Sequence, residues 1–327
     1  MRDVAISVFP RLHVGLLSMH AGAPRMNGGI GFAVDGPAAT IEAKSASSIE
    51  VEDARRFPMG AHELEQLRNV LLAFFERLEL EQGAAFRIHG AMQTHVGMGS
   101  ATAIRLATLQ ALALINSRAV TRGDLVAASG RGGTSGIGVN SYFDGGLVCD
   151  LGRASDGSHF SPSSQIRLAA PALALPWVKM PDWPVLLCIP RSIRSKTQEE
   201  EIAFFDRTAP LPASASFEAS YIALFELYAA AAEADFGTFC RGIEHMQQTA
   251  WKWAERAEYG DELASISTRL RGAGAQCVGM SSLGPMLFCL GDAPRLVDMG
   301  ELARSLGCDI HLVRPVNHGC EVRCVDA

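Results

Sequence analysis

The chain has 327 residues, of which 48% are hydrophobic and 20% charged, and its formal net charge at pH 7 is −6. This hydrophobic fraction excludes a disordered chain, and the length favours two domains or one large domain. Because 29 basic residues stand against 35 acidic ones, the general basic footprint of a nucleic-acid-binding protein is missing. A local basic cluster around a small anionic substrate stays open.

The N-terminal half alternates predicted strands and helices. Alternating hydrophobicity predicts a strand over residues 4–8, and the Gly-rich residues 27–31 are expected to form a loop before a short apolar strand. Leucines and phenylalanines at three- and four-residue spacing predict a helix over 61–80 with one buried face. A strand over 85–89, a helix over 100–115, a helix that Thr121 caps and that ends near Gly130, and a strand over 142–151 follow.

The C-terminal half begins after a stretch rich in Ser, Pro and Ala. This stretch, residues 155–184, disfavours long elements, and it predicts a boundary between domains 1–165 and 166–327. A strand over 185–189, helices over 217–234, 239–256 and 263–271, strands near Cys277 and over 286–290, a helix over 296–306 and two final strands follow. This order predicts an α+β half.

The cysteines and the N-terminus indicate the cellular compartment of the protein. The eight cysteines form no CxxC pair and most lie in apolar runs, which predicts buried, reduced thiols. Cys320 and Cys324 lie close to His318, but no second ligand pair has a usual spacing, and we reject a zinc site there. We expect a cytoplasmic protein with no membrane contact, because no signal peptide is recognisable and every apolar run is interrupted before membrane-spanning length.

The sharpest local motif is HVGMGSATA, residues 95–103, between a predicted strand and a predicted helix. Its glycines permit a tight turn and a close backbone approach to a ligand, and Ser100 can cap the helix. The first amide groups of a helix are unpaired and partly positive, and they bind phosphate. The alternative is a plain Gly-rich turn. The predicted pyrophosphate-binding residues here are Gly97, Gly99, Ser100, Ala101 and Thr102.

A second Gly-rich motif is GRGGTSGIG, residues 130–138. Five glycines with one arginine and two hydroxyls are hard to explain by packing, and a guanidinium offers a fixed fork of donors to phosphate or carboxylate. We therefore predict a ligand loop rather than a solvated flexible loop, and we expect it to open into an apolar strand. Its candidate residues are Arg131, Gly132, Gly133, Thr134 and Ser135.

Two further sets of polar residues are weaker candidates. Near the start, polar groups gather at the ends of a strand and a loop, namely Arg11, His13, Arg25 and Asn27. Near the end, Ser281 and Ser282 lie in the turn GMSSLGP, residues 279–285, which either closes over a ligand or connects two strands. The motifs GxxxxGK[ST], HExxH and GxSxG are absent. The acidic, hydroxyl-rich run of usual phosphoribosyltransferases is absent too, so the residues leave an unusual transferase or a kinase of another fold.

These motifs bring a family resemblance into view. HVGMGSATA resembles the phosphate loop of the GHMP kinase superfamily, whose pattern is roughly PxxxGLGSSAA. RLHVGL, RMNGGIG, HVGMGS, GRGGTSGIG and GMSSLGP, in order from Arg11 to Pro285, together look like the β-ribofuranosylaminobenzene 5′-phosphate synthase family. The resemblance implies an α+β, GHMP kinase-like fold, with an N-terminal domain like the ribosomal S5 second domain and a ferredoxin-like C-terminal domain.

The resemblance also implies a reaction in tetrahydromethanopterin biosynthesis. Phosphoribosyl pyrophosphate would react with 4-aminobenzoate, or with 4-hydroxybenzoate, to give a C-riboside 5′-phosphate, carbon dioxide and pyrophosphate. Mg²⁺ is the implied cofactor, with no ligands assigned, and a homodimer is implied. Arg25, Arg131 and His13 are the catalytic candidates, and either arginine would hold the substrate carboxylate or the ribose phosphate. Because carbon dioxide leaves from the ring carbon that attacks ribose C1, no strong base is needed there, in keeping with the lack of an obvious His–carboxylate pair in the sequence.

Two positions depart from the family pattern. Ser18 stands where relatives usually have an acid, and Asn27 stands where they often have Asp. A catalytically weak ligand-binding paralogue is therefore one alternative. An ATP-dependent GHMP small-molecule kinase is the other, although the late GMSSLGP lacks the GAGxGG form and the front segment lacks the PGRxNLxGEH form usual in those kinases.

Overall fold

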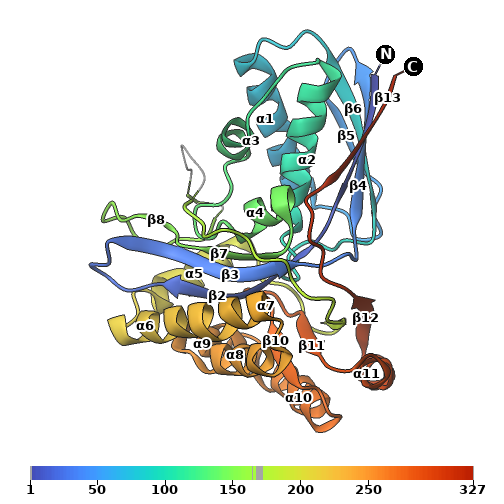
Figure 1. Cartoon of the computed structure of the whole chain (residues 1–327). Helices are drawn as coiled ribbons and strands as arrows, with labels where there is room; N and C mark the ends of the chain where they lie inside the picture. The colour runs from blue at the N-terminus through green and yellow to red at the C-terminus, as the bar shows by residue number, and fades with distance from the viewer. Residues whose placement is uncertain (1, 164, 167–171, 327) are drawn as a thin grey trace.

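Three β-sheets and the helices packed on them form the structure, a computed structural model that describes residues 2–163, 165–166 and 172–326. The first sheet has the order β13-β1-β4-β6-β5, and only the pair β5–β6 is parallel. Its strands are β1 (Arg2–Val8), β4 (Ala39–Ala46), β5 (Glu50–Asp53), β6 (Gly83–Gly90) and β13 (Glu321–Asp326). Because β13 pairs with β1, the two ends of the chain lie side by side at one edge of this sheet (Figure 1).

Helices α1 (Ala61–Arg77) and α2 (Ser100–Ile115) cover one face of the first sheet, and α3 (Arg122–Ser129) packs against these two helices (Figure 1). The apolar spacing predicted for the first of them is confirmed, since Leu67, Leu71 and Phe74 of α1 are buried. The Thr121 hydroxyl accepts a hydrogen bond from the amide of Asp124 and caps α3, as predicted. The local signals therefore located all three helices.

A second sheet crosses the middle of the molecule. It consists of β2 (Arg11–Ser18), β3 (Arg25–Ala33) and β7 (Leu147–Asp150), with β8 (Arg153–Ala154) paired to β3. The prediction of a loop over residues 27–31 is wrong, because these residues lie inside β3. A Cβ at Gly31 would stand 2.2 Å from the carbonyl oxygen of Leu12, so glycine here allows two strands to approach closely rather than a loop to turn.

The strand predicted over residues 142–151 is wrong in its first part. Residues 137–144 form helix α4 (Ile137–Asp144), so the second Gly-rich motif opens into a helix and not into a strand. Ile137, Val139 and Tyr142 are buried in this helix, and Gly145, at φ 67°, ends it before β7. The β-branched and aromatic residues favour a strand locally, and tertiary packing overrides that preference.

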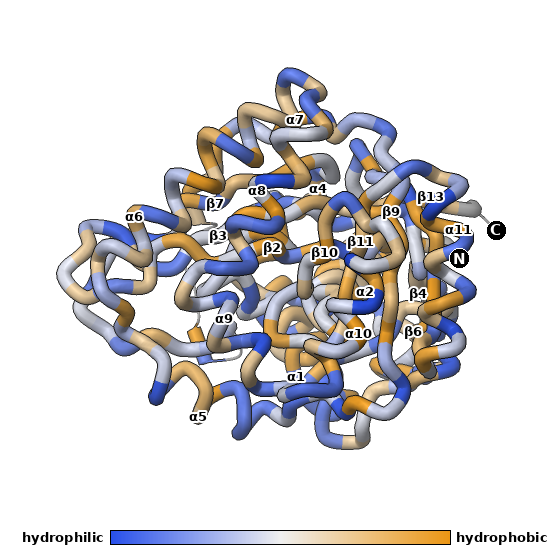
Figure 2. The backbone as a smooth tube through the Cα atoms, turned by 90° about the horizontal axis from the view of Figure 1, so that it is seen from below, coloured by the Kyte–Doolittle hydropathy of each residue, from blue (hydrophilic) through white to orange (hydrophobic). Residues whose placement is uncertain are grey.

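The third sheet has the antiparallel order β10-β11-β9-β12. Its strands are β9 (Val185–Pro190), β10 (Cys277–Met280), β11 (Leu287–Leu290) and β12 (Cys308–Val313). The remaining helical segments are α5 (Gln198–Thr208), α6 (Ala213–Tyr221), the π-helical η1 (Ile222–Tyr228), α7 (Ala229–Glu233), α8 (Phe236–Gln248), α9 (Ala250–Ala257), α10 (Gly260–Gly272) and α11 (Ala293–Ser305). Figure 2 shows hydrophobic residues concentrated along β2, β9, β10 and β11, whereas hydrophilic residues are frequent on the outer helices and loops.

Of two long helices predicted in this half, one is continuous and the other is divided. The helix predicted over 217–234 is continued through η1 and α7, and the one predicted over 239–256 is divided into α8 and α9. Thr249 causes the division, because its ψ of 153° leaves the helical region and its hydroxyl bonds the carbonyl of Met246 instead. Helix α5 was not predicted at all.

The expectations on cysteines and membrane contact can be compared with the described residues. All eight cysteines are free thiols and six of them are buried. Within the described ranges, no group of three His, Cys, Asp or Glu side chains is placed to hold a metal ion. No described helix combines the length and the apolar character needed to cross a bilayer. The boundary between residues 165 and 166 stays a prediction, and β13 from the second half lies in the first sheet.

Candidate active site

A cavity of about 550 Å³ opens where β2 meets α1, α2 and the start of α5. Its lining contains most of the residues that the sequence motifs predicted, although these come from segments far apart in the chain. The predicted residues in the lining are Arg11, His13, Gly97, Gly99, Ser100, Ala101, Thr102, Arg131, Thr134, Ser135 and Ser282. The fold thus brings residues of both Gly-rich motifs, of the turn at residues 279–285 and of the polar set near the start of the chain to one place.

The phosphate loop forms one wall of the cavity at the N-terminus of α2. Gly99, at φ 74°, is the N-cap residue of this helix, so Ser100 is the first helical residue and the prediction that it caps the helix is wrong. Gly97 has φ 103°, and a Cβ there would stand 2.2 Å from the backbone oxygen of Ser281. The first amides of α2 therefore face the cavity without a side-chain cap.

Three arginines surround this loop. Arg11 donates to the carbonyl of Gly97, the Nε of Arg131 lies 3.2 Å from the Thr102 hydroxyl, and an Nη of Arg105 lies 3.2 Å from the carbonyl of Ser129. These three contacts leave further N–H groups of each guanidinium unused. Within the described part of the chain, no carboxylate lies within ion-pair distance of these guanidinium groups.

The environment lowers the pKa of each of the three arginines. Burial, with the neighbouring Arg131, lowers the pKa of Arg11 and that of Arg105 to about 10, and burial lowers the pKa of Arg131 as well. All three remain cationic at neutral pH. A cluster of cations with unused donors at a helix N-terminus is suited to an anion that carries several charges.

The turn at residues 279–285 packs against the phosphate loop. The Ser281 hydroxyl accepts from the amide of His13 at 2.9 Å and donates to the carbonyl of Gly97 at 2.7 Å, and the amide of Ser282 donates to the carbonyl of His13. Ser281 is fully buried and lies outside the cavity lining, whereas Ser282 reaches it. The turn connects the paired strands β10 and β11, which is one of its two predicted interpretations, and these contacts also pack it against the phosphate loop.

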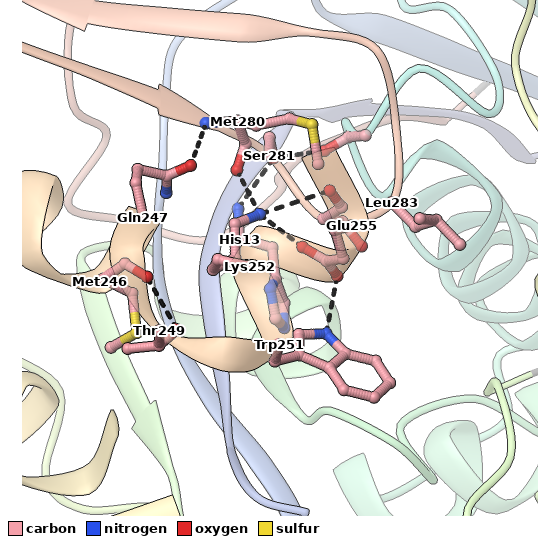
Figure 3. A network of polar contacts seen from close by, with 12 residues as sticks. His13, Met246, Gln247, Thr249, Trp251, Lys252, Glu255, Met280, Ser281 and Leu283 are labelled. Carbon is pink, nitrogen blue, oxygen red and sulfur yellow. Dashed lines mark hydrogen bonds and ion pairs between the residues drawn. The ribbon is translucent and has the colours of Figure 1, made fainter. Parts of the chain in front are cut away.

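A buried ion pair lies beneath this turn (Figure 3). The Lys252 ammonium donates to the Glu255 carboxylate at 2.5 Å and to the carbonyl of Met280 at 2.7 Å, and the Trp251 indole donates to the second oxygen of Glu255 at 2.8 Å. Lys252 is fully buried, and burial lowers its pKa. Sequence reasoning missed both charges, whose only signal is their three-residue spacing on one helix.

His13 is held neutral in the cavity wall. Burial lowers its pKa well below the usual value, and the nearby cations Arg11 and Lys252 lower it further. Its Nε2 lies 3.2 Å from the Ser135 hydroxyl, and its Nδ1 is buried without a partner. His13 therefore orients Ser135 and adds no positive charge to the arginine cluster.

His95 and Glu63 form a pair at the cavity wall, with 2.5 Å between Nε2 and Oε1. The contact with Glu63 raises the pKa of His95, and the contact with His95 lowers the pKa of Glu63. The sequence suggested no His–carboxylate pair, and this expectation is wrong. The partners lie 32 residues apart on different elements, so no local pattern reveals them.

The opposite wall carries a carboxylate from α5. Glu201 lines the cavity, and burial raises its pKa although Arg131, His95 and Arg11 oppose the shift. Helix α5 begins where the Thr197 hydroxyl caps the amide of Glu200. The sequence contains this capping box, which was the available signal for the helix and for its acidic first turn.

Arg25 and Asn27 lie outside the cavity lining, on β3. The Arg25 guanidinium donates to the carbonyls of Leu151 and Gly152 at 2.9 and 2.6 Å. The Asn27 amide donates to the carbonyl of Gly133 at 3.1 Å, while its own oxygen is buried without a partner. The Asn27 contact holds the second Gly-rich loop from behind, whereas the Arg25 contacts hold the chain that follows β7. A direct catalytic role for Arg25 stays a prediction.

The second Gly-rich loop is anchored at several points besides Asn27. The Asp150 carboxylate accepts from the amides of Gly136 and Gly152, and burial raises its pKa to about 6. Gly132 and Gly133 stand outside the lining, and a Cβ at Gly133 would stand 2.3 Å from the Cβ of Ile166. The loop is thus a fitted segment that presents Arg131, and the alternative of a solvated flexible loop is not supported.

The chain is similar in sequence to synthases of known name. No model of a known protein family matches the chain. A β-ribofuranosylphenol 5′-phosphate synthase from Archaeoglobus fulgidus is 30% identical over 301 residues, which cover 90% of this chain and 89% of the relative. The chain belongs to this synthase family. A synthase of the same name from Methanothermobacter thermautotrophicus is 27% identical over 308 residues, covering 93% of this chain and 94% of that one.

Solved structures place the family in a wider fold group. Homoserine kinase from Cytophaga hutchinsonii superposes with a TM-score of 0.67 at 18% identity and covers 98% of this chain and 97% of its own. Mevalonate kinase from L. major superposes with a TM-score of 0.66 at 12% identity, with 96% of each chain covered. The GHMP kinase-like fold that the resemblance implied for this synthase family is confirmed.

Proposed function

We propose that the chain catalyses decarboxylating phosphoribosyl transfer from phosphoribosyl pyrophosphate to 4-hydroxybenzoate or 4-aminobenzoate. The products are a C-riboside 5′-phosphate, carbon dioxide and pyrophosphate, in tetrahydromethanopterin biosynthesis. The observation that carries the proposal is the cluster of three half-buried arginines, without a carboxylate partner in the described part of the chain, at the phosphate loop of a member of the synthase family.

The arginine cluster matches the charge that this reaction develops. When the bond from ribose C1 to pyrophosphate breaks, the leaving group gains negative charge and the sugar gains positive charge. Arg11, Arg131 and the first amides of α2 would stabilise the leaving group, and Arg105 adds a further cation to the same wall. The fixed loops place these donors in advance, so little reorganisation is needed during the reaction.

The aromatic acceptor requires an apolar surface beside the anion site. Several apolar side chains line the same cavity, namely Leu16, Leu67, Ile104, Phe205 and Leu283. They would hold the arene so that the ring carbon bearing the carboxylate faces ribose C1. Carbon dioxide leaves from that carbon, so no proton is removed there.

Mg²⁺ fits this cavity as an ion that a pyrophosphate brings with it. Mg²⁺ commonly keeps several waters and takes one or two protein carboxylates with substrate phosphates, so a cluster of three ligands is not needed. Glu201 lines the cavity and has no hydrogen-bond or ion-pair partner among the described residues. Glu201 and the Ser100 hydroxyl would hold the ion, which neutralises charge on the leaving group when bound.

The two alternatives are less well supported. A likeness to kinases at 12–18% identity concerns the fold alone, and the synthase relatives match about nine-tenths of the chain. The departures at Ser18 and Asn27 lie outside the cavity lining, where their side chains bond backbone carbonyls of Arg25 and Gly133. They leave the arginine cluster intact, which favours an active enzyme over a weak paralogue.

We further propose that the protein is a cytoplasmic homodimer. Three aromatic side chains at four-residue spacing stand on one face of α6 and η1, and they are 59–65% exposed: Phe217, Tyr221 and Phe225. Such a stripe is typical of an interface. Light scattering should give a dimer for the natural protein and a monomer for Phe225→Asp, and a natural protein that is monomeric would contradict this part of the proposal.

The test of the function is product formation by the purified protein. Phosphoribosyl pyrophosphate, Mg²⁺ and each arene are incubated separately, and mass spectrometry looks for the C-riboside phosphate. A parallel reaction contains ATP and small alcohols in place of the ribosyl donor. Product with either arene is expected. Consumption of ATP without any riboside would instead support the kinase.

A further inference from the structure

The His95–Glu63 pair has the geometry of an oriented base. Both oxygens of Glu63 are used, because Oε1 lies 2.5 Å from His95 Nε2 and Oε2 accepts from the amide of Gly60 at 3.1 Å. A carboxylate accepts hydrogen bonds, so His95 Nε2 carries the hydrogen and Nδ1 is left with the lone pair in the neutral ring. This is the arrangement in which a carboxylate fixes the tautomer of a histidine that exchanges protons with a substrate.

The pair is placed where a substrate can reach it. His95 lies two residues before Gly97 of the phosphate loop, and both His95 and Glu63 line the cavity. The side chains are 43% and 30% exposed, so neither is sealed in the protein. His95 also has φ 60°, a left-handed conformation that is strained for a non-glycine residue and is concentrated at functional sites.

The two candidate arenes differ in what they need from the protein. An aryl amine supplies its electron pair to the ring and becomes a stable iminium cation, so it need not lose a proton. A phenol that does the same becomes a strongly acidic protonated ketone, and its attack is assisted by a base that takes the hydroxyl proton. The relatives are named β-ribofuranosylphenol 5′-phosphate synthases, a name that describes a phenol product.

We propose that His95 is the catalytic base that takes the para hydroxyl proton of 4-hydroxybenzoate, and that Glu63 is its positioning residue. The inference rests on the proposed function. As the ring carbon bonds ribose C1 and the bond to pyrophosphate breaks, the hydroxyl oxygen becomes a ketone and its proton passes to His95 Nδ1. Loss of carbon dioxide then returns the electron pair to the ring, and the oxygen recovers the proton from His95. Atoms and charges balance without a further reactant.

The surroundings of His95 tune it for this role. Glu63 on α1 and Glu201 on α5 raise its pKa, whereas burial and Arg131 in the second Gly-rich loop lower it, and the net shift is upward. A raised pKa brings the basicity of neutral His95 closer to that of the phenolate that forms when the hydroxyl loses its proton. His95 must be neutral to accept a proton, so turnover of 4-hydroxybenzoate should rise with pH through the raised pKa.

The test compares two arenes in four proteins: the natural chain, His95→Asn, Glu63→Gln and His89→Asn. His89 is the matched control, because its Nε2 lies 3.2 Å from Glu42 on the first sheet, outside the cavity. His95→Asn should lower kcat with 4-hydroxybenzoate by about 100-fold or more and change kcat with 4-aminobenzoate little. Glu63→Gln should move the rising limb of the 4-hydroxybenzoate profile to lower pH, and His89→Asn should change nothing.

The outcomes separate this inference from the function on which it rests. Equal losses with both arenes, or no loss with 4-hydroxybenzoate in His95→Asn, would overturn the base assignment and leave the transferase standing. Turnover of 4-aminobenzoate alone by the natural chain would also overturn it. No turnover of either arene by the natural chain would overturn the proposed function and the base together. Circular dichroism of each variant confirms that it is folded.

Discussion

The cavity wall contains half-buried charges and the network beneath it contains fully buried ones, and the two sets are arranged in opposite ways. Lys252 is fully buried with the Glu255 carboxylate 2.5 Å away, whereas Arg11, Arg105 and Arg131 have no carboxylate at ion-pair distance within the described residues. A paired buried charge is satisfied in the free protein. Neighbouring unpaired cations repel one another until an anion binds. The Lys252–Glu255 pair therefore stabilises the fold, whereas the arginine cluster is arranged to bind an anionic ligand.

The largest expected effect is on the paired region. Lys252→Met leaves the Glu255 carboxylate buried without its cation, and removing one partner of a buried pair destabilises a protein by about 3–5 kcal/mol. Urea denaturation followed by tryptophan fluorescence measures this loss. The double variant Lys252→Met with Glu255→Gln should recover most of the stability, because no unpaired charge remains. A single variant as stable as the natural protein would contradict the role given to the pair.

The second effect falls on the unpaired region. Arg131→Ala should lower kcat by about 100- to 1,000-fold, the loss typical when one preorganised donor to a developing charge is removed. The free energy of unfolding should stay the same or rise, because a cation that repels Arg11 and Arg105 is gone. Arg118→Ala, an exposed site outside the cavity, serves as the control. Loss of stability together with activity would remove the distinction between the two regions.

Ser100→Ala removes a neutral hydrogen-bond donor from the same cavity wall and so can be compared with the loss of a charged donor in Arg131→Ala. Its hydroxyl is not used to cap α2 and lines the cavity. A hydrogen bond to a charged group contributes about 1.5–3 kcal/mol, so kcat/KM for the ribosyl donor should fall by roughly 10- to 100-fold. Steady-state kinetics at saturating arene measures it. An effect as large as that of Arg131→Ala would mean that charge does not dominate the site.

The smallest effect concerns the half-exposed pair His95–Glu63. A raised histidine pKa contributes stability that is present below pH 6.5 and is lost as pH rises through the raised value. Exposure limits this contribution to less than about 1 kcal/mol. The difference in Tm between the natural protein and Glu63→Gln should therefore be larger at pH 6 than at pH 9. A difference that grows with pH would reverse the assigned direction.

Features set by neighbours in the sequence were predicted correctly, and features set by contacts between distant segments were not. Periodicity and capping predicted α1, α2 and the start of α3 at Thr121, because these signals depend on neighbours within a few residues. The glycines inside β3 and the residues of α4 were misassigned, since their conformation is set by packing on distant strands and helices. The glycines of β3 favour a loop by local propensity, although in the structure they allow neighbouring strands to approach closely.

The same limit applies to the site. The two Gly-rich ligand loops could be predicted, because the residues that identify each loop lie within nine consecutive positions. Arg105 was missed although it lies one turn of α2 after Thr102, and a cation at that spacing was the available signal. The pair His95–Glu63 joins residues 32 apart, which no local pattern reveals. The spacing of Lys252 and Glu255 and the capping box of α5 were local signals, but the burial of the first and the approach of Glu201 to the cavity depend on how the helices pack.

The central claim is that ribosyl transfer and decarboxylation occur at one carbon in this cavity. The most direct measurement uses 4-hydroxybenzoate labelled with ¹³C in the carboxyl group, with phosphoribosyl pyrophosphate and Mg²⁺. The account predicts that labelled carbon dioxide and pyrophosphate appear in equal amounts and that the riboside contains no label. Pyrophosphate released without labelled carbon dioxide, or a riboside that keeps the label, would contradict it.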